Sequence, residues 1–158
     1  AAYLIMALGV GGIIVLTGTD LSAGRTLGIT ACISASLLQK SDYAKKMWDG
    51  INLGESYAGI ILVLIICIAI GALVGLVNGF CVAKFSLHPF IVTLATQLMI
   101  YGAVLIYVEQ GNNAGAPISG LTDKYSNLAK GTLFKIGKTT IPAYVLYAII
   151  MVVIMWFV

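Results

Sequence analysis

The residues best suited to chemistry lie together in one octapeptide, Gly18-Thr19-Asp20-Leu21-Ser22-Ala23-Gly24-Arg25. It places a carboxylate (Asp20), a hydroxyl (Ser22) and a guanidinium (Arg25) close together, with apolar sequence on both sides. Charged groups at membrane depth are costly unless they face a cavity, the interior of a helix bundle or each other. The octapeptide therefore predicts a polar site whose work goes beyond anchoring the chain, with Asp20, Ser22 and Arg25 as its candidate residues.

A second set of polar residues lies in otherwise apolar sequence further along the chain. Thr93, Gln97 and Tyr101 are spaced four residues apart, which places them on one face of a helix. Uncharged hydrogen-bonding groups beside an aromatic ring suit a neutral polyol or sugar, and hydrogen bonding between helices explains them equally well. Asn78 is the only strongly polar side chain in the second half of its apolar stretch, and it must face another helix or a solute path.

Other kinds of chemistry find no support. The three cysteines lie in apolar stretches without CxxC spacing, and His88 is the only histidine, so no metal site, cofactor or catalytic residue is expected. The Gly137-Lys138-Thr139 tripeptide resembles the end of a phosphate-binding loop, but Thr132 stands where that loop requires its first glycine. The net charge of +3 is scattered, which argues against nucleic-acid binding.

Composition identifies the elements that must position these residues. Hydrophobic residues make up 60% of the chain, charged residues only 9%, and the mean hydropathy is +1.03, as in an integral membrane protein. Charge-free stretches cover 1–19, 26–39, 56–83, 85–108 and 139–158. All but 26–39 are long enough to span a bilayer alone. We therefore predict an all-α, polytopic transmembrane bundle.

The short stretch 26–39 requires an unusual helix, because it is adequate only if the helix begins near Leu21. Glycines and a Thr-Asp-Leu-Ser turn between two apolar runs predict a broken or re-entrant helix near residues 18–25, with Asp20 or Ser22 as its N-cap. An ordinary interfacial loop before a capped helix is the alternative. In the next segment Gly71, Gly75 and Gly79 repeat every four residues, which predicts close helix packing.

Alternation of the spans places the polar connections 40–55 and 109–140 on one side of the membrane and Lys84 on the other. We assign the two connections to the outside, although the charge of +2 on the longer one argues against it. The chain lacks an initiator Met and remains apolar to Val158, so we expect residues 1–158 to be one transmembrane domain within a longer protein.

Several motifs together resemble a known family. They are the octapeptide, Gly75-Leu76-Val77-Asn78-Gly79, Pro89-Phe90-Ile91-Val92-Thr93-Leu94 and Pro117-Ile118-Ser119-Gly120. In this order and spacing they resemble the permease subunits of bacterial monosaccharide ABC importers of the ribose and galactose family, most closely the galactose/methyl galactoside permeases.

The resemblance implies a homodimeric, multi-pass permease of the bacterial inner membrane that forms the sugar path within membrane lipid. It also implies a periplasmic sugar-binding protein and a separate cytoplasmic ATPase subunit, so the chain itself would not be an enzyme. The loop that couples to the ATPase would follow the last span. Two alternatives stay open: half of an ion-coupled secondary transporter or channel with Asp20 as the coupling site, and a purely structural membrane subunit.

Overall fold

The computed structural model describes residues 19–44, 46–113, 115–130, 132–136 and 139–142, with isolated positions 7, 10–11, 145, 149–150 and 152–153, and without the side chains of 113 and 128–142. The chain divides into two compact units, Thr19–Thr122 and Ala1–Gly18 with Asp123–Val158. Each unit is described by itself. Most of the predicted spans at 1–17 and 139–158 lies outside the described residues.

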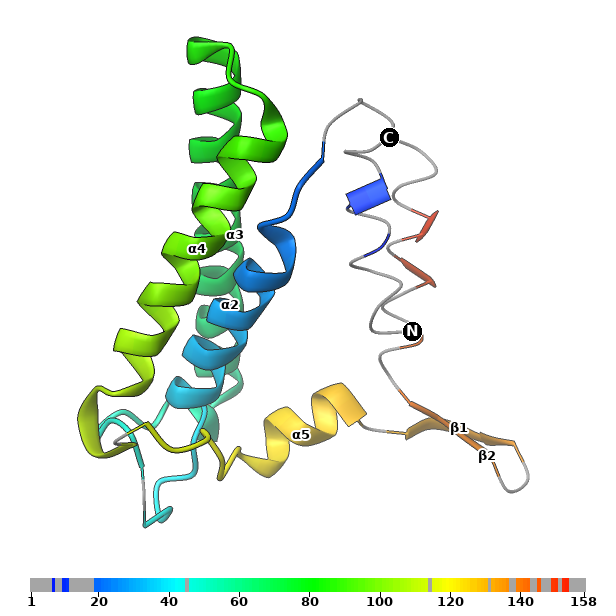
Figure 1. Cartoon of the computed structure of the whole chain (residues 1–158). Coiled ribbons are helices and arrows are strands. Elements are labelled where there is room, and N and C mark those ends of the chain that lie inside the picture. The colour runs from blue at the N-terminus through cyan, green and yellow to red at the C-terminus, as the bar shows by residue number, and fades with distance from the viewer. Residues whose placement is uncertain are drawn as a thin grey trace. The chain divides into compact units, whose positions relative to one another are not determined.

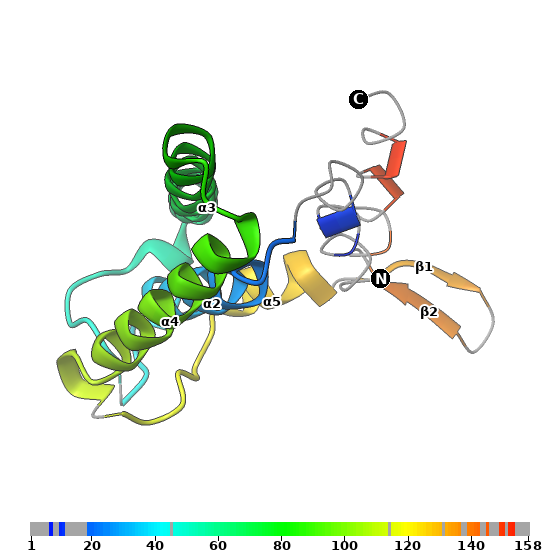
Figure 2. The same ribbon diagram turned by 45° about the horizontal axis from the view of Figure 1, so that its top comes forward.

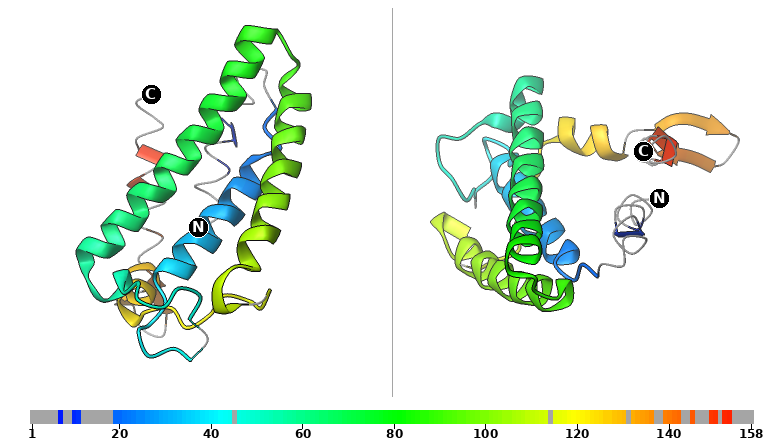
Figure 3. Two further views of the ribbon diagram at one scale, coloured as in Figure 1. Left: turned by 90° about the vertical axis from the view of Figure 1, so that its left-hand side faces the viewer. Right: turned by 90° about the horizontal axis from the view of Figure 1, so that it is seen from above.

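Three helices form the Thr19–Thr122 unit: α2 (Ala23–Leu37), α3 (Tyr57–Phe85) and α4 (Pro89–Val108). α3 ends where Ser86 adopts a left-handed φ of 51°, and α4 begins with Pro89 in its first turn, so the two helices form a hairpin. α2 packs against both of them and lies in the angle between them (Figures 1 and 3). The start of α2 points toward the α3–α4 turn, and its end lies near the open end of the hairpin.

The helices confirm the predicted class, because the described chain is mainly helical. α3 and α4 are the two described helices that are long and apolar enough to cross a membrane, and they match the predicted stretches 56–83 and 85–108. α3 exposes large apolar side chains along most of its length, which is typical of a helix that faces lipid or other protein. α2 has 15 residues and is about 22 Å long, shorter than the ~30 Å hydrocarbon core.

The other unit contains secondary structure that the sequence did not predict. A short helix, α5 (Asp123–Lys130), is followed by the antiparallel strands β1 (Thr132–Ile136) and β2 (Thr139–Pro142), which form a hairpin (Figure 2). In its register Ile136 pairs with Thr139 and Phe134 with Ile141. The prediction that a membrane span begins at Thr139 is therefore wrong at its first four residues, which pair with β1 through their backbone instead.

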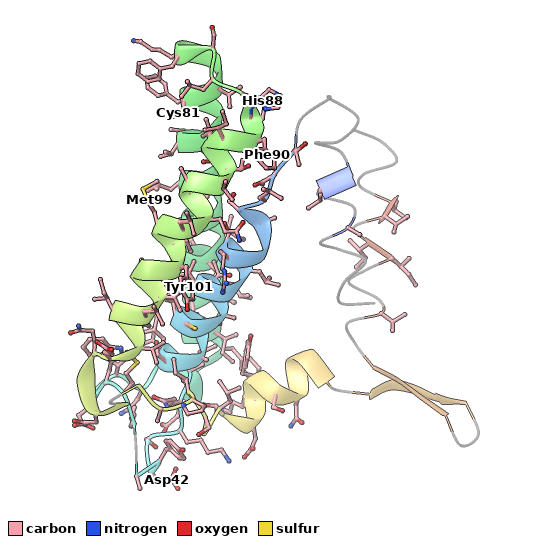
Figure 4. All side chains as sticks on the ribbon, in the orientation of Figure 1. Asp42, Cys81, His88, Phe90, Met99 and Tyr101 are labelled. Carbon is pink, nitrogen blue, oxygen red and sulfur yellow. The ribbon has the colours of Figure 1, made fainter. Side chains whose placement is uncertain are left out.

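The connections at the open end of the α3–α4 hairpin fold against each other. The first, 38–56, contains the 3-10 helix η1 (Leu53–Glu55), and the second, 109–122, contains η2 (Gly111–Asn113). Gln39 and Leu121 form an isolated antiparallel bridge between them. Figure 4 labels Asp42 at this end of the unit, opposite His88 at the α3–α4 turn. The first connection and the part of the second up to Thr122 thus lie at the same end of the hairpin, as alternation of the spans predicted for this part of the chain.

Candidate functional site

Four polar side chains form a continuous hydrogen-bond chain where α2 begins. Asp20 Oδ1 accepts hydrogen bonds from the Ser22 backbone N–H at 2.8 Å and the Ser22 hydroxyl at 2.6 Å. Asn78 Nδ2 donates to Ser22 Oγ at 3.1 Å, and Thr96 Oγ1 donates to Asn78 Oδ1 at 2.6 Å. The chain, which we call the Ser22 network, joins the segment before α2 to α3 and α4. Ser22, Asn78 and Thr96 are all buried, with exposed fractions of 1%, 8% and 7%.

Asp20 determines the direction of every hydrogen bond in the Ser22 network. An ionised carboxylate only accepts, so the single hydroxyl proton of Ser22 points to Asp20, and Ser22 Oγ must accept the next bond. The Asn78 amide nitrogen therefore faces Ser22, its oxygen faces Thr96, and the Thr96 hydroxyl donates to it. A network with one consistent direction, in which every buried side-chain polar atom is paired, favours one arrangement of the three helices.

Thr93 forms a second tie beside the network. Its hydroxyl oxygen lies 2.9 Å from the Pro89 carbonyl oxygen, one turn earlier in α4, and 3.2 Å from the Thr19 carbonyl oxygen. The Thr93 side chain is 5% exposed. Together with the Ser22 network, this contact holds the octapeptide against the first turns of α4.

Arg25 and Tyr101 form the second pair of predicted residues that the structure brings together. The Arg25 Cζ atom lies 4.5 Å from the centre of the Tyr101 ring, within the range of a cation–π contact between α2 and α4. Both side chains are exposed, Tyr101 by 43%. In Figure 4 Tyr101 lies on the α2 side of α4, whereas Met99 points away from it. Within the described residues Arg25 makes no ion pair with Asp20.

The predicted stripe on α4 passes from a buried to an exposed environment. Thr93 is buried, Gln97 one turn later is partly exposed, and Tyr101 is exposed. Among the described residues no hydrogen bond is assigned to the Gln97 side chain, so its amide is available to a solute or to water. The three residues keep their predicted spacing on one helix, but only Gln97 and Tyr101 present polar groups outward.

The octapeptide differs in one respect from the predicted capped helix. Ser22 does occupy the N-cap position of α2, but its side chain makes no cap hydrogen bond and its backbone is already helical. The Ser22 hydroxyl is committed to Asp20 and Asn78 instead, so burial of the network takes precedence over capping. The upstream half of the predicted broken helix falls in 12–18, outside the described residues.

Three residues that were not among the predicted site residues complete the contacts between helices. Thr96 closes the Ser22 network, and its signal was a hydroxyl one turn after Thr93 in an apolar helix. Ser36 and Tyr107 join α2 to α4 nearer the open end, with their hydroxyl oxygens 2.6 Å apart. No local pattern pairs residues so far apart in the chain.

The predicted packing glycines face open space in this unit. A Cβ atom placed on Gly71, Gly75 or Gly79 would meet no other described atom within 4 Å. The contact between α2 and α3 therefore does not use this stripe. Its role in close packing stays a prediction that concerns some other partner.

These features define a class of protein: a helical membrane protein with two long apolar helices and a buried polar network between them. The chain belongs to the family described as branched-chain amino acid transport system / permease component, which matches residues 1–158.

Named relatives agree with this assignment. The chain is 39% identical to the galactose/methyl galactoside import permease protein MglC of Escherichia coli over 153 residues, covering 97% of this chain and 44% of the relative. Identity to MglC of Haemophilus influenzae is 37% over 153 residues, with the same coverage of 97% and 44%. The ribose import permease protein RbsC of Haemophilus influenzae is 30% identical over 156 residues, covering 98% of this chain and 41% of the relative. The chain thus spans less than half the length of the curated relatives it matches. No solved structure shows significant similarity to it.

Proposed function

We propose that this chain is part of the permease subunit of an ATP-binding cassette importer for a monosaccharide, and that it forms part of the path of the sugar across the bacterial inner membrane. The observation that carries the proposal is the identity of 37% to 39%, over nearly the whole chain, to permeases named for galactose and methyl galactoside import. The identity of 30% to a ribose permease is lower, so galactose or methyl galactoside is the proposed cargo.

The proposed partners follow from the same relatives and from the resemblance in the sequence. They are a second permease copy, a cytoplasmic ATPase subunit that hydrolyses ATP, a periplasmic sugar-binding protein and the surrounding lipid. We infer a multi-pass chain with the connections 38–56 and 109–122 on the periplasmic side. There, together with the rest of 109–140, they would meet the binding protein.

The exposure of the candidate residues supports a division of roles between them. Four candidate residues make hydrogen bonds to one another or to the backbone, and we assign them to bracing the helices: Asp20, Ser22, Asn78 and Thr93. The guanidinium of Arg25, the amide of Gln97 and the ring of Tyr101 are at least partly exposed on neighbouring faces of α2 and α4, so we assign these groups to the path. A ring with hydrogen-bonding groups beside it suits the apolar face and the hydroxyls of a sugar.

The test is uptake of radiolabelled galactose by cells that carry the full-length permease, with the genes for the binding protein and the ATPase deleted in turn. We expect uptake to be lost in both deletions and to be sensitive to vanadate in the intact strain. Uptake that survives both deletions and needs an ion gradient would instead support the alternative, a secondary transporter or channel with Asp20 as its coupling site.

A further inference from the structure

The end of α2 is fastened to the segment after α4 by one buried side chain. Gln39 is only 1% exposed, and its amide oxygen accepts a hydrogen bond from the Met47 backbone N–H at 2.8 Å. Its amide nitrogen donates to the Ser119 carbonyl oxygen, also at 2.8 Å. A single side chain therefore joins both connections at the open end of the hairpin, using its donor and its acceptor at once.

Backbone pairing around Gln39 extends this joint. The Leu38 carbonyl oxygen accepts hydrogen bonds from the Thr122 N–H at 3.0 Å and the Thr122 hydroxyl at 2.8 Å. The Lys40 N–H donates to the Gly120 carbonyl oxygen at 2.8 Å. A more exposed pair lies further out, where Asn112 Nδ2 donates to Asp49 Oδ2 at 2.7 Å. The two connections are thus paired at several separate points rather than at one.

Two close approaches show how tightly the connections fit. Gly120 has a φ of +77°, and a Cβ atom placed on it would lie 2.5 Å from the Tyr43 ring. Gly54 is buried, and a Cβ atom there would meet the Thr122 hydroxyl oxygen and lie 2.9 Å from the Leu38 carbonyl oxygen. A larger residue requires the Tyr43 ring to shift at position 120, and the Thr122 side chain and the Leu38 backbone to shift at position 54, so the surface depends on this packing.

We propose that Gln39 is a positioning residue that holds both connections as one preformed surface, on which the soluble sugar-binding protein of the proposed importer docks. The inference rests on the proposed function and names the residue that shapes the docking surface. A surface that is already ordered loses less conformational entropy on association, so its affinity for the partner is higher than that of loose connections. Gln39 itself is buried and makes no contact with the partner.

The experiment uses the full-length permease with its ATPase in proteoliposomes, with sugar-loaded binding protein titrated on the outside. Gln39→Met keeps the length of the side chain and removes both hydrogen bonds. Thr30→Val is the control, because Thr30 lies within α2 away from both connections and its hydroxyl donates only to the Thr26 and Leu27 carbonyl oxygens of the same helix. Gly120→Ala is a second variant, which loosens the same surface while residue 39 remains Gln.

We expect Gln39→Met and Gly120→Ala each to raise the binding-protein concentration for half-maximal uptake by about tenfold, with the maximal rate per inserted permease changed less than about twofold. The control should match the wild type. A lower maximal rate at an unchanged half-maximal concentration means a purely structural role and overturns the proposal, as does no change in either quantity. If the rate of uptake by the wild type does not depend on the concentration of binding protein, the proposed function is refuted, and the inference with it.

Discussion

The Asp20 carboxylate takes part in fixed hydrogen bonds within the protein. Its Oδ1 atom already accepts two hydrogen bonds from Ser22, and those bonds set the direction of the Ser22 network as far as Thr96. An ion or proton that bound at Oδ1 would compete with these two hydrogen bonds. At the residue scale, we therefore propose that Asp20 braces the helices, and its role in ion coupling stays the alternative.

Replacing Asp20 by Asn should lower the rate of sugar uptake by the full-length permease about tenfold, because a charge-assisted hydrogen bond contributes about 1.5–3 kcal/mol and a difference of 1.4 kcal/mol is tenfold. The amide can point either its oxygen or its nitrogen at Ser22, so the direction of the network is no longer fixed. Initial uptake rates, divided by the amount of inserted permease, measure the effect. Asp42→Asn is the matched control, measured with saturating binding protein because Asp42 is exposed in a connection that would meet that protein. Unchanged uptake by Asp20→Asn would refute the bracing role.

Asn78 and Thr96 should be energetically coupled. Removing Thr96 takes away the hydrogen bond of the buried Asn78 amide oxygen, whereas removing Asn78 leaves the Thr96 hydroxyl only its contact with the Val92 carbonyl oxygen, so the second removal costs less than the first. In a double-mutant cycle of Asn78→Ala and Thr96→Val we expect a coupling energy of about 0.5–1.7 kcal/mol, as for other hydrogen bonds between membrane helices. Reversible unfolding of the full-length permease in detergent measures it. Strictly additive effects would show that the bond makes no net contribution.

Residue types were easier to predict than residue partners. The sequence identified Asp20, Ser22 and Asn78 because polar groups in apolar stretches must find partners, and the structure joins these three. It could not assign Thr96 or Gln39, because nothing local to either residue specifies a partner in a distant part of the chain. Hydrogen bonds between helices and between connections depend on tertiary packing, which local spacing does not encode.

At the scale of elements, the long apolar runs were the reliable signal. α3 and α4 begin and end within a few residues of the predicted stretches, because Pro89 and the polar connections stop each helix. α5 and the β1–β2 hairpin were missed, since the polar, turn-rich composition of 109–140 resembles that of an irregular connection. For the same reason the sequence did not predict that residues 119–122 form hydrogen bonds with the end of α2.

The glycine face of α3 should take part in an association that this unit does not contain. Gly71, Gly75 and Gly79 offer a smooth surface with no described atom near it. If a second permease copy packs there, Gly75→Leu should weaken the homodimer at least tenfold, because the larger side chain blocks close approach of the helices. Cross-linking of the full-length permease at graded dilution measures this. Ala69→Leu, exposed on another face of α3, is the control, and equal effects of the two variants would assign the glycines a different role.

At the scale of the Thr19–Thr122 unit, α2 is fastened at both ends. The Ser22 network and Thr93 hold its start to α3 and α4, and Leu38 and Gln39 hold its end to the segment after α4. A helix tied at both ends cannot slide along its neighbours without breaking buried hydrogen bonds. We therefore expect this unit to move as one body during transport, so that its exposed groups open and close against other parts of the permease.

That arrangement predicts which positions of α4 a solute can reach in the assembled permease. With Cys32, Cys67 and Cys81 replaced by Ala, cysteines at Gln97 and Tyr101 should react with a polar thiol reagent, whereas cysteines at Thr93 and Thr96 should react at least about tenfold more slowly, because buried groups react only when the structure opens. Galactose should slow the reaction at Gln97 and Tyr101, since a sugar in the path covers both. Met99→Cys, on the opposite side of α4, controls for exposure to lipid, where the reagent does not partition. If all four test positions are unreactive, the polar stripe serves only to join helices, and the path of the sugar must lie along another face of the permease.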